Sequence, residues 1–81
     1  MEPSAPPLTR EALASVLGQA GVAPTTYHLY GAHINDAVIL DHRAVGWVVF
    51  YSERGGEFSL RRHGTEDAAC RDLLARLGVR C

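Results

Sequence analysis

The stretch Gly46–Ser52, which reads GWVVFYS, decides the fold of this chain. Its β-branched and aromatic side chains are typical of a β-strand, and it is apolar on both sides. Because alternate side chains of a strand point to opposite faces, Trp47, Val49 and Tyr51 share one face, while Val48 and Phe50 share the other. We expect the first group, which has the larger volume, to pack against helices.

Three further short runs surround this stretch and have the composition of strands, namely residues 27–30, 37–41 and 57–62. The segments between the runs are short and rich in turn-forming residues, such as Asn35-Asp36 and Arg54-Gly55-Gly56. Connections this short favour hairpins and therefore antiparallel pairing. The sequence predicts a four-stranded antiparallel meander.

Two helices are expected to flank the strands. Thr9 and Thr65 precede segments with helical apolar spacing, and threonine is a favoured N-cap residue. Gly21 and Gly78 are well placed to end the two helices. The predicted fold is therefore an α+β domain of two layers, with the order α-β-β-β-β-α and both helices on one face of the sheet. We expect residues 8–81 to form this single domain and the proline-rich residues 1–7 to be a mobile tail.

The overall composition is that of a small globular protein. The 81 residues are 47% hydrophobic and 21% charged, with a net charge of −1. Without a basic excess, binding to nucleic acid through its phosphates is not expected. No apolar run reaches the length of a membrane span, and the start resembles no signal peptide, so we expect a cytoplasmic protein with no membrane partner.

No diagnostic catalytic, metal or cofactor motif is present, so no residue is assigned to any of these roles. The four histidines (His28, His33, His42 and His63) match no zinc-binding spacing, and no serine lies in a G-x-S-x-G elbow. Cys70 falls within the apolar pattern of the last helix and is expected to be a small buried residue.

The sequence predicts more apolar sheet surface than two helices cover. With Phe58 and Leu60 facing the helices, Val48 and Phe50 would lie on an open face beside Glu57 and Arg61. An apolar centre with a charged rim is typical of a protein-binding patch. Alternatively, the N-terminal segment or a second copy of the chain covers this face.

The turn between the last two predicted strands carries Glu53 and Arg54. It either projects these side chains into a cleft of a partner or is simply a solvated turn. The predicted partner-binding residues are Val48, Phe50, Glu53, Arg54, Glu57 and Arg61.

Two segments resemble those of small bacterial proteins encoded beside polymorphic toxins. Gly46–Gly55 is similar to a strand and turn of the form W-x-V-x-Y-S-E-R-G, and Thr65–Leu74 is similar to a helix of the form T-E-D-x-A-C-x-x-L-L. The resemblance covers residues 46–77. It implies an immunity protein, which binds one cognate toxin domain and blocks its active site. The rival hypotheses are a homodimeric structural or adaptor domain and, less favoured by the sequence, a small enzyme.

Overall fold

The computed structural model describes residues 7–79, and most of the predicted tail lies outside this range. Two α-helices and a four-stranded sheet form an α+β fold, as the sequence predicts. The elements in chain order are α1 (Arg10–Gln19), the short 3₁₀ helix η1 (Pro24–Thr26), β1 (Tyr27–His28), β2 (Ala37–Arg43), β3 (Gly46–Glu53), β4 (Gly56–His63) and α2 (Glu66–Arg76).

The sheet is mixed, which corrects the prediction of a wholly antiparallel meander. Its strand order is β1-β2-β3-β4, and β2, β3 and β4 pair antiparallel as expected. β1 has only two residues and pairs parallel with β2, with Tyr27 opposite Val38. For β2 to run parallel to β1, the chain must pass back along the sheet to the end at which β1 begins. Residues 29–36 form this connection.

Both predicted helix starts are confirmed. The side chain of Thr9 accepts a hydrogen bond from the amide of Ala12 at 3.2 Å, and Thr65 accepts one from the amide of Ala68 at 3.1 Å. Each threonine therefore satisfies one of the amides that a helix start leaves without an internal partner.

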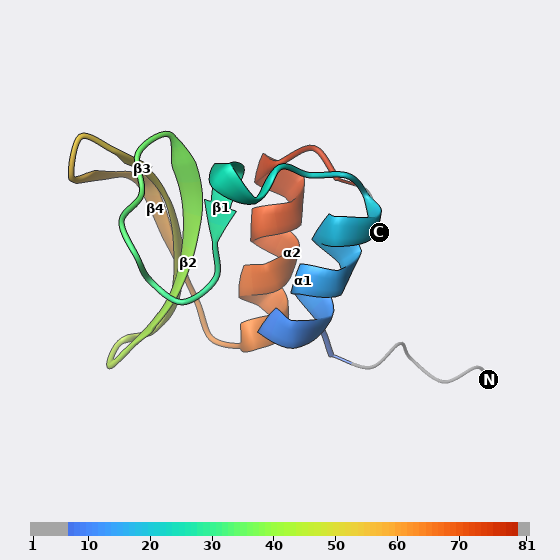
Figure 1. The fold of residues 1–81 in the computed structure, drawn as a ribbon. Helices are drawn as coiled ribbons and strands as arrows, with labels where there is room; N and C mark the ends of the chain where they lie inside the picture. The colour runs from blue at the N-terminus through green and yellow to red at the C-terminus, as the bar shows by residue number, and fades with distance from the viewer. Residues whose placement is uncertain (1–6, 80–81) are drawn as a thin grey trace.

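The two helices lie on the same side of the sheet, as predicted (Figure 1). α2 packs directly on the strands, and α1 packs on α2. Val49 is fully buried in the core between these layers, and Trp47 and Tyr51 pack against it, which confirms their predicted face. The buried side chains of this core are Leu13, Leu17, Leu29, Val38, Leu40, Val49, Ala69, Cys70, Leu73 and Leu74.

The opposite face of the sheet, which we call the second face, is also buried at its centre. Ile39 and Phe50 are 0% exposed and Val48 is 1% exposed, so the expectation that Val48 and Phe50 form an open patch is wrong. Figure 1 shows the reason, because the loop between β1 and β2 runs along this side of the sheet. Ile34 of this loop packs against the buried cluster, and the His33 ring lies 5.2 Å from the Phe50 ring. Within the described residues, this loop supplies the cover.

A small network of charges holds the covering loop, residues 29–36, in place. Glu57 accepts a hydrogen bond from Arg43 Nη2 at 2.6 Å, and its Oε2 lies 2.7 Å from His33 Nε2. Arg43 also donates to Asp41 at 2.9 Å, and its guanidinium carbon lies 5.2 Å from the centre of the Phe50 ring. β2, β4 and the loop are therefore joined directly above the apolar cluster.

The backbone of the covering loop has one position that only glycine fits. Gly31 has a φ of +89°, in the left-handed region that other residues rarely adopt. A β-carbon at this position would lie 2.6 Å from Oδ1 of Asp41, closer than atoms can pack. His28 supports the same turn, because its Nδ1 accepts hydrogen bonds from the amides of Tyr30 and Ala32.

We predict that Gly31→Ala destabilises the protein by about 2 kcal/mol, because it combines backbone strain with a clash against Asp41. Gly18→Ala is the matched control. Gly18 lies in α1 with no atom within 4 Å of an added β-carbon, so alanine there should stabilise the protein by about 0.5–1 kcal/mol. Urea denaturation of both variants measures these changes, and equal stability of the two would contradict the account of the loop.

Candidate functional site

A β-bulge in β4 determines which of its side chains reach which face. Phe58 pairs with Tyr51 and Arg61 pairs with Val49, so Ser59 and Leu60 together lie opposite the single residue Phe50. Ser59 has a φ of 54°, which is typical of the first residue of such a bulge. Directly paired residues share a face, so the bulge places both Phe58 and Arg61 on the helix side.

The bulge overturns part of the predicted side-chain pattern. Phe58 faces the helix side as expected, but it is 51% exposed. Leu60 precedes Arg61, so strand alternation turns it to the second face, where it is 44% exposed. Arg61, predicted to point outward beside Phe50, instead shares the helix side with Val49.

The six predicted partner-binding residues therefore do not form one patch. Val48 and Phe50 are buried, and Glu57 is bound to Arg43 and His33 at the edge of the covering loop. Glu53 and Arg54 lie at the hairpin tip, and Arg61 lies on the other face of the sheet. Only the tip residues and Arg61 remain candidates for contact with a partner.

Four side chains, one from each strand, form a row across the helix side of the sheet. This row, which we call the first row, provides a different apolar surface. Tyr27, Val38, Tyr51 and Phe58 pair with one another in sequence across all four strands. The exposed fraction of these side chains rises from β2 toward the β4 edge. Val38 is buried, Tyr51 is partly buried and Phe58 is half exposed. The Tyr51 hydroxyl donates a hydrogen bond to Asp36 at 3.1 Å. Partial burial and this bond raise the pKa of Tyr51.

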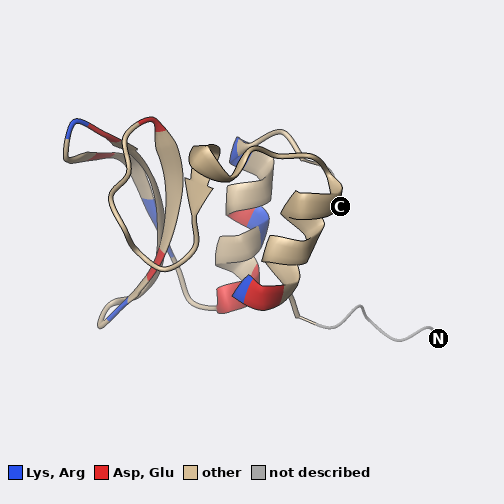
Figure 2. Ribbon diagram, viewed as in Figure 1, with Lys and Arg blue, Asp and Glu red and all other residues tan. Residues whose placement is uncertain are grey.

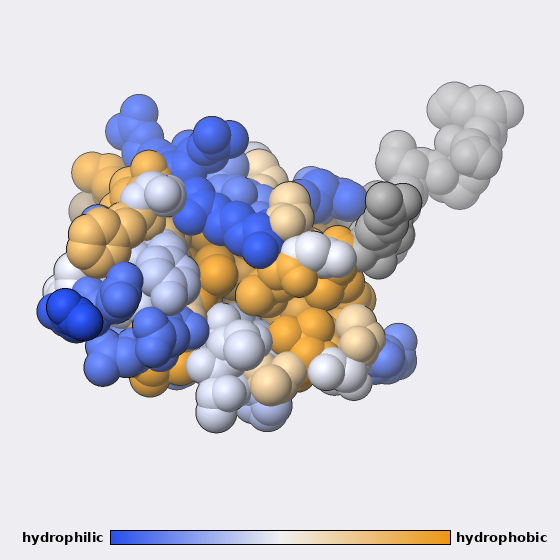
Figure 3. Space-filling model, turned by 90° about the horizontal axis from the view of Figure 1, so that it is seen from above, coloured by the Kyte–Doolittle hydropathy of each residue, from blue (hydrophilic) through white to orange (hydrophobic). Residues whose placement is uncertain are grey.

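A hollow of about 440 Å³ lies beside this row, between the β3–β4 hairpin and the C-terminal half of α2, and we call it the hairpin hollow. The β3–β4 hairpin and the C-terminal half of α2 both lie in the upper part of Figure 1. Figure 3 views the molecule from above and shows hydrophobic groups in the middle of this face, with hydrophilic groups on the hairpin side. The residues lining the hollow are Val38, Tyr51, Ser59, Arg61, Asp72 and Arg76.

The charges on the α2 side of the hairpin hollow are paired with one another. Asp72 accepts from Arg76 Nε at 3.0 Å and lies 2.8 Å from His63 Nε2, while Arg76 also donates to the carbonyl of Ser59 at 2.7 Å. Burial opposes the charge of Asp72, but the hydrogen bonds with His63 and Arg76 outweigh it and keep the pKa of Asp72 below its usual value. Asp72 is therefore an ionised anchor between β4 and α2.

Arg61 differs from Arg76, because within residues 7–79 it forms no ion pair or side-chain hydrogen bond. The hollow thus contains two arginines against one carboxylate. Figure 2 shows another group of charges at the hairpin tip, where Arg54 also has no ion pair within the described residues.

Over residues 7–79, neither cysteine nor the metal-ligating side chains form a site. Cys70 is fully buried, as predicted, and burial together with the nearby Glu66 carboxylate raises the pKa of its thiol to about 11. It therefore stays protonated at neutral pH. Among the described residues, no three His, Cys, Asp or Glu side chains lie close enough to hold a metal ion.

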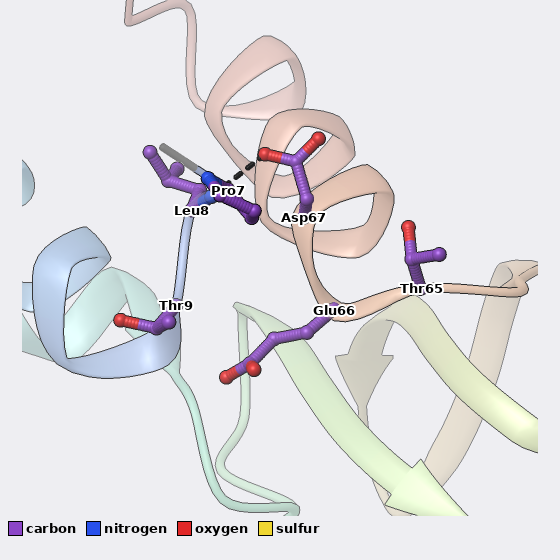
Figure 4. Close-up of a pocket in the computed structure, with 6 residues that line it drawn as sticks. All are labelled: Pro7, Leu8, Thr9, Thr65, Glu66 and Asp67. Carbon is purple, nitrogen blue, oxygen red and sulfur yellow. Dashed lines mark hydrogen bonds between the residues drawn. The ribbon is translucent and has the colours of Figure 1, made fainter. Parts of the chain in front are cut away.

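A second hollow, at the N-terminal ends of the helices, is explained by folding. Figure 4 shows it between the start of α1 and the first turn of α2. Asp67 accepts a hydrogen bond from the amide of Leu8 at 2.8 Å, and Glu66 accepts one from the amide of Arg10 at 2.9 Å. The bonds from Leu8 and from Arg71 lower the pKa of Asp67. These carboxylates cap α1 and join it to α2.

Comparison with known proteins identifies no relative. No protein-family model, curated protein or solved structure matched the chain. None of the described helices has the length and apolar character needed to cross a lipid bilayer.

We predict that the charge of Glu57 stabilises the covering loop in a pH-dependent way. Hydrogen bonds from Arg43 and His33 lower the pKa of Glu57 from 4.5 to about 2. A lowered folded-state pKa contributes stability above pH 4.5 that disappears as the pH falls through 2. The difference in unfolding free energy between wild type and Glu57→Gln should therefore be largest near pH 6 and shrink toward zero near pH 2.

Glu53→Gln is the control, because Glu53 lies in the same hairpin but forms no ion pair within the described residues. Its difference from wild type should stay within about 0.5 kcal/mol at every pH. Urea titrations across this range provide the measurement. A pH-independent effect of Glu57→Gln would show that charge on Glu57 does not hold the loop.

Proposed function

We propose that this chain is a protein-binding domain that docks a partner on the exposed end of its first sheet row and on the adjacent hairpin hollow. The observation that carries the proposal is Phe58, a half-exposed aromatic residue on the same face of β4 as Arg61, whose guanidinium forms no ion pair within the described residues. Aromatic and arginine side chains are enriched at protein interfaces, and aromatic anchors near a polar rim contribute much of the binding energy. This site replaces the buried patch around Phe50.

The class of partner follows from the resemblance to immunity proteins. We propose that the partner is a cognate toxin domain in the bacterial cytoplasm and that binding occludes its active site. The strand-and-turn motif on which the resemblance rests contains Tyr51 of the docking surface and the tip residues Glu53 and Arg54. In this arrangement Phe58 is the apolar anchor, and the tip side chains make contacts at the rim.

The hairpin tip is suited to such a rim position. Arg54 and Gly55 have φ values of 52° and 79° and form the tight two-residue turn of the hairpin. The Arg54 amide donates to Asn35 Oδ1 at 2.9 Å, which fixes the tip against the covering loop while its guanidinium forms no ion pair within residues 7–79. A fixed backbone reduces the entropy lost when the side chain binds.

The test is to measure binding to the toxin domain encoded beside this gene. We expect Phe58→Ala to weaken the affinity at least about tenfold, a loss of about 1.4 kcal/mol. Leu60→Ala is the matched control, since Leu60 is similarly exposed in the same strand but lies on the second face; its affinity should stay within about twofold of wild type.

Isothermal titration calorimetry provides both affinities, and circular dichroism confirms that the variants are folded. Absence of binding by the wild type would reject the toxin as partner. Wild-type affinity of Phe58→Ala, or equal losses in both variants, would reject the docking surface.

The rival homodimer is expected to bury the face around Val48 and Phe50 against a second copy, and the covering loop already occupies that face. The other surface that a homodimer could use is the free edge of β4. The bulge at Ser59 and the charged pair Arg61-Arg62 interrupt this edge, and both features oppose pairing with another strand. We therefore favour a different protein as the partner. Sedimentation at micromolar concentration distinguishes the two, because a stable dimer of the chain alone would favour the homodimer.

A further inference from the structure

We propose that the hairpin hollow is a subsite for a carboxylate of the partner that lies next to an apolar side chain. Arg61 binds the carboxylate, and the surface of Tyr51 and Phe58 receives the apolar group. This inference rests on the proposed function and specifies the chemistry of the segment that docks.

The charge of the hollow favours an anion. Both oxygens of Asp72 are already engaged, Oδ1 by Arg76 and Oδ2 by His63. Arg76 is turned toward Asp72 and the Ser59 carbonyl, so its position is fixed within the protein. Arg61 is left as the cation of the hollow with no acidic partner among the described residues. A guanidinium is suited to a carboxylate because its planar donors form two parallel hydrogen bonds with it.

The floor of the hollow and the surface beside it favour an apolar group next to that carboxylate. Val38 and Tyr51 form the apolar part of the lining, and Phe58 continues the same row toward the edge of the sheet. The hollow is open to solvent, so it offers a contact surface for a side chain of a docked segment rather than an enclosed pocket. An inorganic anion would leave this apolar surface exposed, so an acidic protein segment fits the hollow better than a free phosphate.

The experiment uses hydrocinnamate, a small molecule with one phenyl ring and one carboxylate. We expect it to shift the backbone amide signals of the ¹⁵N-labelled chain at Tyr51, Ser59 and Arg61, with a dissociation constant on the order of millimolar. Protonated phenethylamine has the same ring with the opposite charge, and inorganic phosphate has the charge without the ring. Neither should reproduce the shifts at these positions.

Arg61→Gln and Arg62→Gln form the matched pair of variants. They are adjacent exposed arginines in β4, but Arg62 pairs with Val48 and points to the second face. Hydrocinnamate should bind Arg62→Gln like wild type, whereas Arg61→Gln should lose affinity about tenfold or more. The amide spectra themselves show whether each variant is folded.

The subsite would be overturned if hydrocinnamate caused no shifts at the hollow in the wild type. It would also be overturned if hydrocinnamate shifted the Arg61→Gln variant as strongly as the wild type. Phosphate shifts as large as those of hydrocinnamate would also overturn it, by showing a general anion site. These outcomes are independent of the toxin-binding measurement. If the chain binds the toxin but not hydrocinnamate, the proposed function stands and the subsite is rejected. If it binds hydrocinnamate but not the toxin, the toxin is rejected as partner and the subsite stands.

Discussion

Glu57 lies between Arg43 and His33, and the contacts among these three side chains fix the covering loop over the apolar cluster around Phe50. The rest of the structure depends on this closure, because a sheet that is apolar on both faces must bury both of them. The helices bury one face and the loop buries the other. The chain thereby gains a second small core, with Ala37, Ile39, Val48 and Phe50 at its centre. For a domain of only 81 residues this second core is a sizeable part of the total buried apolar surface.

Closure of the second face also determines where a partner can dock. Once Phe50 is covered, the remaining exposed aromatic surface on the sheet lies at the β4 end of its first row, at Phe58. The bulge that follows Phe58 turns Arg61 into the hairpin hollow and leaves Leu60 on the opposite side. The irregular backbone at Ser59 therefore brings Arg61 to the same face of the sheet as Tyr51 and Phe58. In a regular strand, Arg61 would lie on the opposite face.

The sequence predicted the parts of the fold that depend on local patterns. The caps at Thr9 and Thr65, the helix face of Trp47 and Tyr51, and the antiparallel pairing of the last three strands follow from neighbouring residues, and all are confirmed. The parallel strand β1 and the cover over Phe50 depend on contacts between distant residues, such as His33 with Glu57, which periodicity does not reveal. The bulge had no sequence signal either, because Ser59 is not a glycine and sits in a run with ordinary strand character. Without the cover and the bulge, the sequence predicts Val48 and Phe50 on an open face, whereas the structure buries both.

The central claim is that the loop closes the second face in the isolated chain, and an NMR measurement of nuclear Overhauser effects tests it directly. The account predicts cross-peaks between the rings of His33 and Phe50, whose centres are 5.2 Å apart, and between Ile34 and the side chains of the same buried cluster. Absence of these cross-peaks, together with rapid solvent exchange of the amides in residues 29–36, would show an open face around Phe50. That result would contradict the closure and return the docking surface to that face.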